Sequence, residues 1–188
     1  MQIPVESEKP MPSPLIITSV VSLVPQFLVI GYHDVRYRRI PNPYVLAVLV
    51  SGFALNAIFA GSAGVVDSVG GCVLALGLML MLHMFGAMGA GDVKLFAAVG
   101  SVIGIHLVLP TFVIVVLTGG LLAVIVMLLS GTARITMWRV SHILLGFLPG
   151  WKVPRYEIPT DRRQTIPYGV AITAGSLVAL LVLSRLRR

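Results

Sequence analysis

Two aspartates stand out because apolar sequence surrounds them. Asp34, in "VIGYHDVRYRRIPNPY", directly follows one apolar segment, and Asp92, in "GAMGAGDVKLF", opens another. An ionised carboxylate in a helix at bilayer depth costs about 2.5–3.5 kcal/mol on insertion scales, and less near an interface. Carboxylates in such places are usually kept for a chemical reason.

The chemistry that two such acids can perform depends on their being neighbours. Carboxyl groups a few ångströms apart do not ionise together easily, so they share a proton near neutral pH. The ionised member can then take a proton from water while the protonated member polarises a peptide carbonyl group. This is the chemistry of aspartic proteases, and it needs neither a metal nor a covalent intermediate.

The residues around Asp92 fit this chemistry. Gly86, Gly89 and Gly91 would let an extended substrate backbone approach closely. Lys94 would either lower the pKa of a neighbouring acid or extend its amine to the lipid headgroups, and we favour the second role.

A simpler interpretation makes both aspartates helix caps, Asp34 at a helix end among arginines and Asp92 as the N-cap of its helix. Taken singly, each aspartate is better explained in this way. Taken together, at one membrane boundary, the pair favours catalysis. The other five acids fall in predicted loops, the leader or span edges, where a solvated carboxylate needs no explanation: Glu6, Glu8, Asp67, Glu157 and Asp161.

Composition predicts an all-α, polytopic membrane bundle. Of the 188 residues, 57% are hydrophobic and 11% are charged, and the mean hydropathy is +0.97. A soluble domain is roughly 45–50% apolar and about 25% charged. Here the apolar residues fall in runs of about 18 or more, which suit a hydrocarbon layer of roughly 30 Å.

The apolar runs predict six membrane spans, at 15–32, 43–60, 67–85, 93–105, 107–129 and 166–184. As a single helix, residues 93–129 would measure about 55 Å, nearly twice the apolar layer. This stretch should therefore fold back on itself, and Gly100, Gly104 and Pro110 are the candidate turning points.

The basic residues predict the orientation of these spans. The net charge is +7, and because the basic residues flank the spans, we attribute it to topology rather than to nucleic-acid binding. Six spans put both termini on one side. The loops on the other side hold ten of the fourteen basic residues, so residues 33–42, 86–92 and 131–165 should be cytoplasmic. The "RLRR" tail argues mildly the other way. The chain should therefore cross its membrane several times.

The domain organisation expected from this layout is simple. Residues 1–14 contain two glutamates and four prolines, unlike a secretory signal, and should form a short disordered leader. Residues 15–188 should form one membrane-embedded domain, with 131–165 as its sizeable polar, cytoplasmic loop. The first half of that loop is either a helix lying in the interface or a loop packed against the bundle.

Three motifs in order resemble those of one family. "GAGDVKL" at 89–95 resembles the GxGD signature of intramembrane aspartyl proteases, in the form typical of type IV prepilin peptidases. "DVRYRRIPN" at 34–42 is similar to that family's first motif, an Asp followed six residues later by Ile-Pro-Asn. "IPYGVAI" at 166–172 is similar to its third motif, a Pro-aromatic-Gly stretch that opens the last span.

The resemblance implies an enzyme that removes leader peptides from prepilins or pilin-like secretion subunits at the cytoplasmic face of the membrane. It implies Asp34 and Asp92 as the catalytic pair. The other residues at motif positions would shape the site or bind substrate: Gly89, Gly91, Lys94, Pro41, Asn42, Pro167, Tyr168 and Gly169. The implied partners are the prepilin substrate and the lipid bilayer, and the resemblance alone implies placement in the cytoplasmic (inner) membrane of the cell.

One departure from the family pattern concerns methylation. Larger members of the family carry a cysteine-rich cytoplasmic domain between the first two spans and also methylate the new N-terminus. Here that loop has about ten residues and no cysteine, and the single cysteine, Cys72, lies in an apolar span where packing is its expected role. We therefore expect a peptidase without methyltransferase activity, bound metal or cofactor. The compact form resembles the peptidases of tight-adherence (Flp-type) pili, and archaeal preflagellin peptidases are similar in size.

Other classes of protein fit less well. A zinc site-2-type protease needs a His-Glu-x-x-His helix, which the four histidines do not supply. A rhomboid-type serine protease needs a reactive Gly-x-Ser, and "AGSAG" at 60–64 falls in a predicted loop. The alternative from another class is a small transporter or pilus-assembly scaffold that relays protons or ions, but a relay needs carboxylates along a path through the bilayer.

Overall fold

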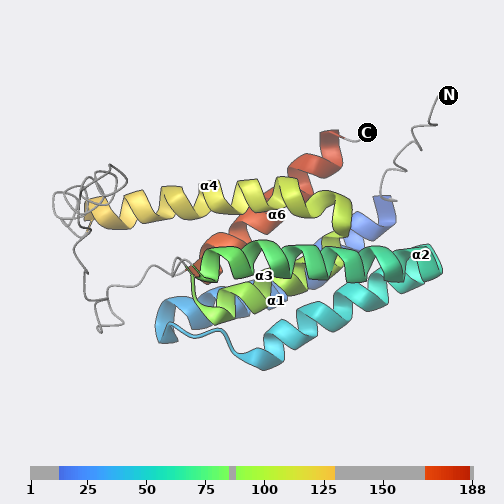
Figure 1. The fold of residues 1–188 in the computed structure, drawn as a ribbon, viewed down its shortest axis with the longest axis horizontal. Helices are drawn as coiled ribbons and strands as arrows, with labels where there is room; N and C mark the ends of the chain where they lie inside the picture. Colours follow the sequence, from blue (N-terminus) through green and yellow to red (C-terminus); the bar gives the residue numbers. More distant parts are fainter. Residues whose placement is uncertain (1–12, 85–87, 130–167, 187–188) are drawn as a thin grey trace, which may run out of the picture.

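The computed structural model describes residues 13–84, 88–129 and 168–186. They form five helices: α1 (Ser13–Tyr37), α2 (Asn42–Met84), α3 (Ala90–Ile103), α4 (Ile105–Leu129) and α6 (Tyr168–Leu186), arranged as a bundle (Figure 1). The predicted all-helical class is confirmed. The predicted leader falls almost wholly outside the described residues, as does the loop 131–165.

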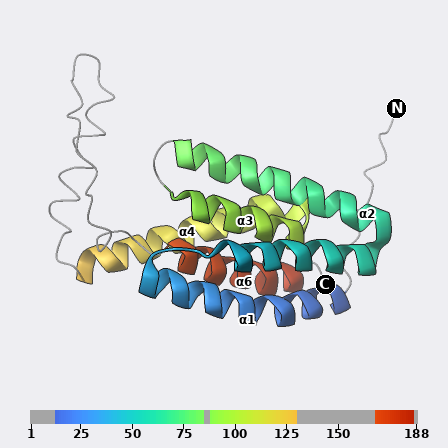
Figure 2. The same ribbon diagram turned by 90° about the horizontal axis from the view of Figure 1, so that it is seen from below.

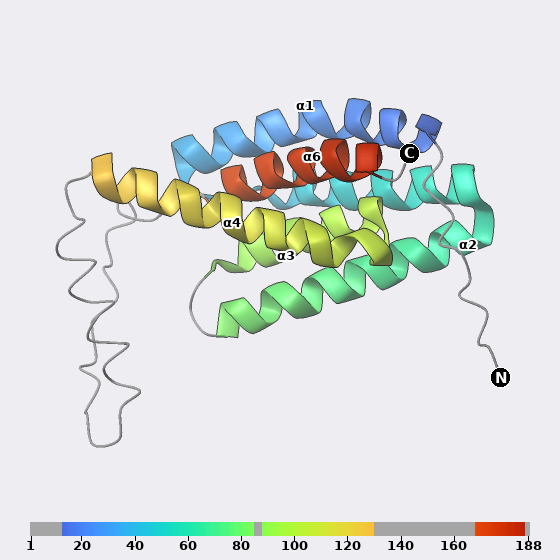
Figure 3. The ribbon, with the colours of Figure 1, turned by 90° about the horizontal axis from the view of Figure 1, so that it is seen from above.

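Helix α2 consists of two arms that meet at a kink. Gly61 has φ 61° and ψ −142°, a backbone conformation open to glycine but not to residues with a Cβ atom. The arms, 42–60 and 62–84, correspond to the predicted second and third apolar segments and diverge from the kink (Figure 3). The break predicted at "AGSAG" is present at Gly61, but it is shorter than the predicted loop, because helical structure continues directly on both sides of Gly61.

The chain turns back between α3 and α4 at Gly104, one of the three predicted turning points. Gly104 has φ 73°, and its N–H donates to the carbonyl oxygen of Gly100, which ends α3. Gly100 and Pro110, the other two candidates, lie inside helices.

Asp67 differs from its predicted role as a solvated acid at the edge of a span. It lies within α2, half-buried, and its Oδ1 accepts a hydrogen bond of 2.9 Å from the N–H of Ile105. Ile105 is the first residue of α4, so Asp67 caps the unpaired amino end of that helix from a neighbouring helix. Its carboxyl group also lies directly over Gly104, where any side chain would collide with it.

Helix α3 is the central element of the bundle. It packs against α2, α4 and α6 and lies between the arms of α2 (Figure 2). From Leu95 to Ile103 every residue is buried, with Phe96 and Leu95 completely so. A helix that is apolar all round belongs in the interior of a bundle. Asp92, at its amino end, is therefore held by the best-packed helix of the fold.

Small residues and buried polar groups join α2 to α3. A Cβ atom on Gly52 would lie 2.9 Å from the backbone carbon of Ser101, so the two helices meet backbone to backbone. Asn56 Nδ2 donates to the carbonyl oxygens of Ser101 (3.0 Å) and Val102 (3.2 Å), and Ser68 Oγ also donates to Ser101 (2.6 Å). Close packing and interhelical hydrogen bonds of this kind stabilise helix pairs in lipid.

The helices run back and forth between two ends of the bundle. One end gathers the carboxyl end of α1, both ends of α2, the amino ends of α3 and α6 and the carboxyl end of α4 (Figure 1). The described parts of all three sequence motifs therefore meet there. Helices α2 and α4 are long and apolar enough to cross a membrane. The number of spans and their orientation stay predictions.

Candidate active site

Asp34 belongs to the inward face of α1. The buried residues of this helix follow a spacing of three or four: Ser19, Leu23, Phe27, Ile30 and Asp34. Such spacing puts side chains on one face of a helix. Helix α1 continues to Tyr37, so Asp34 lies inside its last turns rather than after it. Asp34 is only 7% exposed. Its carboxyl group faces the interior of the bundle because it lies on the same face of α1 as the buried apolar residues that precede it.

The amino end of α6 covers the Asp34 carboxyl group. The backbone N–H groups of Gly169 and Val170 face that carboxyl group, and a helix amino end carries partial positive charge. A Cβ atom on residue 169 would lie 2.8 Å from Asp34 Oδ2 and 2.9 Å from Cγ. Only glycine therefore lets α6 approach this closely. Within the described part of the chain, Oδ2 is buried without a fully formed hydrogen bond.

Asp92 lies in the first turn of α3, half-buried. Its Oδ2 accepts a hydrogen bond of 3.1 Å from the N–H of Gly89, the residue at the N-cap position. The cap interpretation is thus partly right, because Asp92 reaches back to the helix start like the acidic member of a capping box. Gly89 has no side chain for the reciprocal bond, and a Cβ atom there would lie 3.2 Å from Asp92 Oδ2.

The two carboxyl groups lie close enough together to repel each other electrostatically. They come from different helices, Asp34 near the carboxyl end of α1 and Asp92 at the amino end of α3. Asp34 is the more buried residue, and Asp92 is more open to solvent. An acid pair in such an arrangement can divide the tasks of holding a proton and accepting one.

The other residues of the first two motifs shape the segment beside this pair. The carbonyl oxygen of Pro41 accepts hydrogen bonds from the N–H groups of Tyr44 (3.2 Å) and Val45 (3.5 Å) and so begins α2. A Cβ atom on Gly91 would lie 3.6 Å from the Cβ of Ile40. The segment that joins α1 to α2 therefore rests on the start of α3, next to Asp92.

In the third motif, Tyr168 and Gly169 belong to the described residues, whereas Pro167 lies outside them. A Cβ atom on Gly119 of α4 would lie 3.2 Å from the Cε1 atom of Tyr168. The tyrosine ring thus packs on α4 while the next residue, Gly169, packs on Asp34. Together these contacts fix the amino end of α6 over the carboxyl pair.

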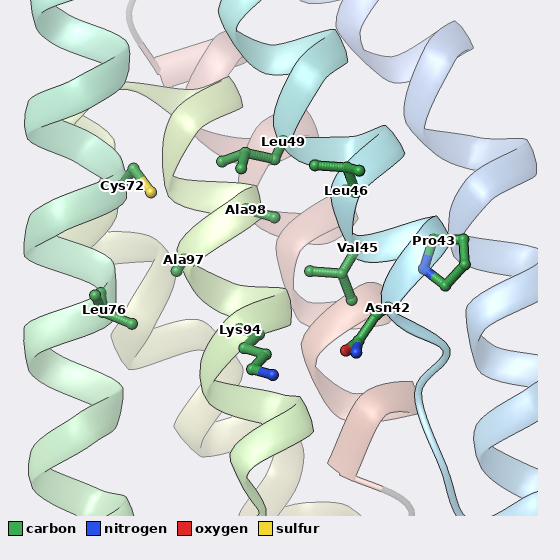
Figure 4. Close-up of a pocket in the computed structure, with 10 residues that line it drawn as sticks. All are labelled: Asn42, Pro43, Val45, Leu46, Leu49, Cys72, Leu76, Lys94, Ala97 and Ala98. Atoms are coloured by element: carbon green, nitrogen blue, oxygen red, sulfur yellow. The ribbon is translucent and has the colours of Figure 1, made fainter.

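Asn42 and Lys94 line a groove outside the carboxyl pair. The groove, of about 590 Å³, lies between both arms of α2 and α3, and its other eight residues are Pro43, Val45, Leu46, Leu49, Cys72, Leu76, Ala97 and Ala98. In Figure 4, Asn42 and Lys94 lie toward one end of the groove and the apolar side chains extend away from them. A second pocket, of about 450 Å³, lies beside it and shares Asn42 with it.

Sequence reasoning missed the residues that hold the helices in place. Asn56 and Gly119 belong to none of the three motifs. Asn56 nevertheless joins α2 to α3 by a hydrogen bond to Ser101, and Gly119 leaves room for the ring of Tyr168. The available signal was the recurrence of small residues at four-residue spacing in apolar helices, as in Gly52 and Asn56 or Gly64 and Ser68.

Within the described residues, no group of three or more histidine, cysteine, aspartate or glutamate side chains is placed to hold a metal ion.

Comparison with known proteins identifies the family. A family model described as "Type IV leader peptidase family" matches residues 21–124, more than half of the chain, including both Asp34 and Asp92. The chain belongs to the type IV leader peptidase family. It is therefore a membrane protein.

A relative from Bacillus subtilis (strain 168), named "Prepilin leader peptidase/N-methyltransferase", is 24% identical over 164 residues. The alignment covers 86% of this chain and 54% of the relative, so this chain spans about half the length of that protein. No solved structure matches the chain.

Proposed function

We propose that this protein is an aspartic endopeptidase that removes the leader peptide from prepilins or pilin-like subunits. Membership of the type IV leader peptidase family supports this, as does the printed name of the B. subtilis relative. The observation that carries the proposal is that Asp34 and Asp92, from two different helices, lie close enough at one end of the bundle for their carboxyl groups to interact electrostatically.

The proposed reaction begins with one proton shared by the two carboxyl groups. The ionised carboxylate accepts a proton from water as the water oxygen bonds to the scissile carbonyl carbon. The protonated carboxyl group gives its proton to the carbonyl oxygen, which forms a neutral tetrahedral diol. One carboxyl group then protonates the leaving nitrogen, the carbon–nitrogen bond breaks, and a diol proton returns to the other carboxylate.

The remaining motif residues would support this pair without reacting. Gly169 would leave room for Asp34, and the hydrogen bond from Gly89 would hold one oxygen of Asp92. The glycine-rich start of α3 offers little side-chain bulk next to Asp92, which suits an approaching peptide backbone. Pro41 and Tyr168 would fix the two segments that flank the pair.

The proposed location is the cytoplasmic membrane, with the carboxyl pair at its cytoplasmic face. The basic residues of the segment between α1 and α2 and of the α3 start lie at the same end of the bundle as the pair, and basic segments are retained inside. We expect residues 15–188 to act as one membrane-embedded domain with several passes.

Co-expression tests the proposed activity. This protein is produced together with each candidate prepilin encoded in the same genome, in a host that lacks its own prepilin peptidase. The expected result is a shift of one or more prepilins to the size of the mature subunit, with a new N-terminus at a single site. Unchanged prepilins in every pairing, with the protein present in the membrane, would contradict the proposal.

A further inference from the structure

The groove between α2 and α3 has the form of a ligand site rather than of a packing defect. Its volume of about 590 Å³ falls within the roughly 300–1,000 Å³ of small-molecule sites. Its walls are almost wholly apolar, and two of its rim residues face outward, Leu46 (58% exposed) and Leu76 (40% exposed). The groove therefore opens on the side of the bundle.

The polar side chains of the groove gather where the motif segments meet. Lys94 is exposed, and in the described part of the chain no carboxylate forms an ion pair with it. Asn42, which lies near it (Figure 4), also lines the second pocket together with Arg39 and His33. One end of the apolar groove thus carries one cation, Lys94, and one amide, Asn42.

A cation at one end of an apolar groove favours a ligand that is anionic at one end and apolar at the other. A cation at a membrane boundary favours an anionic partner, and basic pockets between membrane helices bind the headgroups of anionic lipids. A phospholipid has the matching shape, with a phosphate at one end and acyl chains at the other. The apolar segment of a peptide would fill the apolar part of the groove but would leave Lys94 without an anion.

We propose that this groove binds an anionic phospholipid of the bilayer, with its headgroup at Lys94 and Asn42 and an acyl chain between the arms of α2. The bound lipid would fill the space between α2 and the amino half of α3, the helix that carries Asp92. The proposal does not depend on the leader-peptidase activity, because lipid binding is measured without a peptide substrate.

Native mass spectrometry of the purified protein tests headgroup selection. The detergent-solubilised chain is titrated with phosphatidylglycerol or phosphatidylcholine of the same acyl length at low salt. At equal concentration we expect phosphatidylglycerol to occupy the site about fivefold more, as expected for one lysine near an anionic lipid. Lys94→Gln should remove this preference. Arg36→Gln, which removes an exposed cation of α1 that does not line the groove, should keep it.

A second pair of variants tests the acyl-chain position. Leu46 and Val50 lie one turn apart on α2 and are 58% and 57% exposed, but only Leu46 lines the groove. Leu46→Trp should lower the occupancy of both lipids several-fold, whereas Val50→Trp should leave both unchanged.

The position of the lipid is mapped with phosphatidylglycerol that carries a photoreactive group on its acyl chain. We expect cross-links in residues 42–49, in 94–98 and around Cys72, the single cysteine of the chain. Equal occupancy by the two lipids would overturn the proposal, as would cross-links spread over the outer face of α4. A lipid-independent dimer that Leu46→Trp disrupts would show that a second copy occupies the groove, and would also overturn it.

Discussion

Gly169→Ala is the substitution whose effect the structure defines most sharply. The added methyl group would lie 2.8 Å from Asp34 Oδ2, 2.9 Å from Cγ and 3.2 Å from Cβ. Cβ contacts under 3.0 Å are essentially never found and ordinary ones begin at 3.4 Å, so the carboxyl group or the start of α6 must move, by up to about 0.6 Å to restore an ordinary contact. The backbone at this position needs no unusual angle, so the perturbation is one of space alone.

A shift of this size matters for catalysis. Catalytic groups must lie within about 0.5 Å of their productive positions, and a misplacement of about 1 Å can lower the rate by about 100-fold. We therefore expect Gly169→Ala to lower kcat for leader cleavage by between about 10- and 100-fold, or about 1.4–2.7 kcal/mol in activation free energy. KM should change little, because Gly169 acts through Asp34 rather than on the peptide.

The assay uses purified protein in proteoliposomes and an uncleaved prepilin that co-expression has shown to be a substrate, with kcat and KM measured separately. Gly31→Ala is the matched control, because Gly31 lies one turn before Asp34 on α1 and an added methyl group meets nothing within 4 Å. The control should cleave at the wild-type rate. Wild-type kcat in Gly169→Ala would show that contact between α6 and the carboxyl group does not position Asp34.

Three further predictions address stability, metal and methylation. Asp67→Ala removes the cap of α4 and should lower the free energy of unfolding by about 1 kcal/mol, seen as a lower thermal midpoint, while leader cleavage stays near the wild-type rate; an unchanged midpoint would contradict the capping role. Leader cleavage should survive chelators, because a carboxylate can activate water without an ion; loss of activity that zinc restores would point to a metalloenzyme. The mature pilin should leave this enzyme with an unmodified N-terminus, because only a short segment joins α1 to α2; mass spectrometry that finds an added methyl group would disprove this.

Much of the helical layout could be predicted from the sequence because apolar runs and glycines mark it directly. The predicted spans 93–105 and 107–129 correspond to α3 and α4, and the turn falls at Gly104, one of three residues named. The predicted loop between spans 43–60 and 67–85 is a turn at Gly61 alone, since a single glycine with positive φ joins two helices as well as a longer loop does. The helix limits differ most in α1, which continues to Tyr37 because its polar last turns stay helical.

The site was less predictable because it depends on contacts between distant helices. The motif spacing named Asp34, Asp92 and Gly169, but only the fold reveals that Gly169 lies against the Asp34 carboxyl group. Asp67 was misread for the same reason, since its partner, Ile105, is far away in the sequence. Local sequence does not encode such pairings, which arise only when the helices pack.

Leader cleavage by Asp34→Asn, Asp92→Asn and the double variant shows directly whether Asp34 and Asp92 act as one catalytic unit. Each variant keeps the size of the side chain, and its amount in the membrane and its thermal midpoint serve as controls for folding. Groups that act together lose about as much when one is removed as when both are. We predict that all three variants fall to the same background while remaining folded. Near-normal turnover in either single variant would contradict the account.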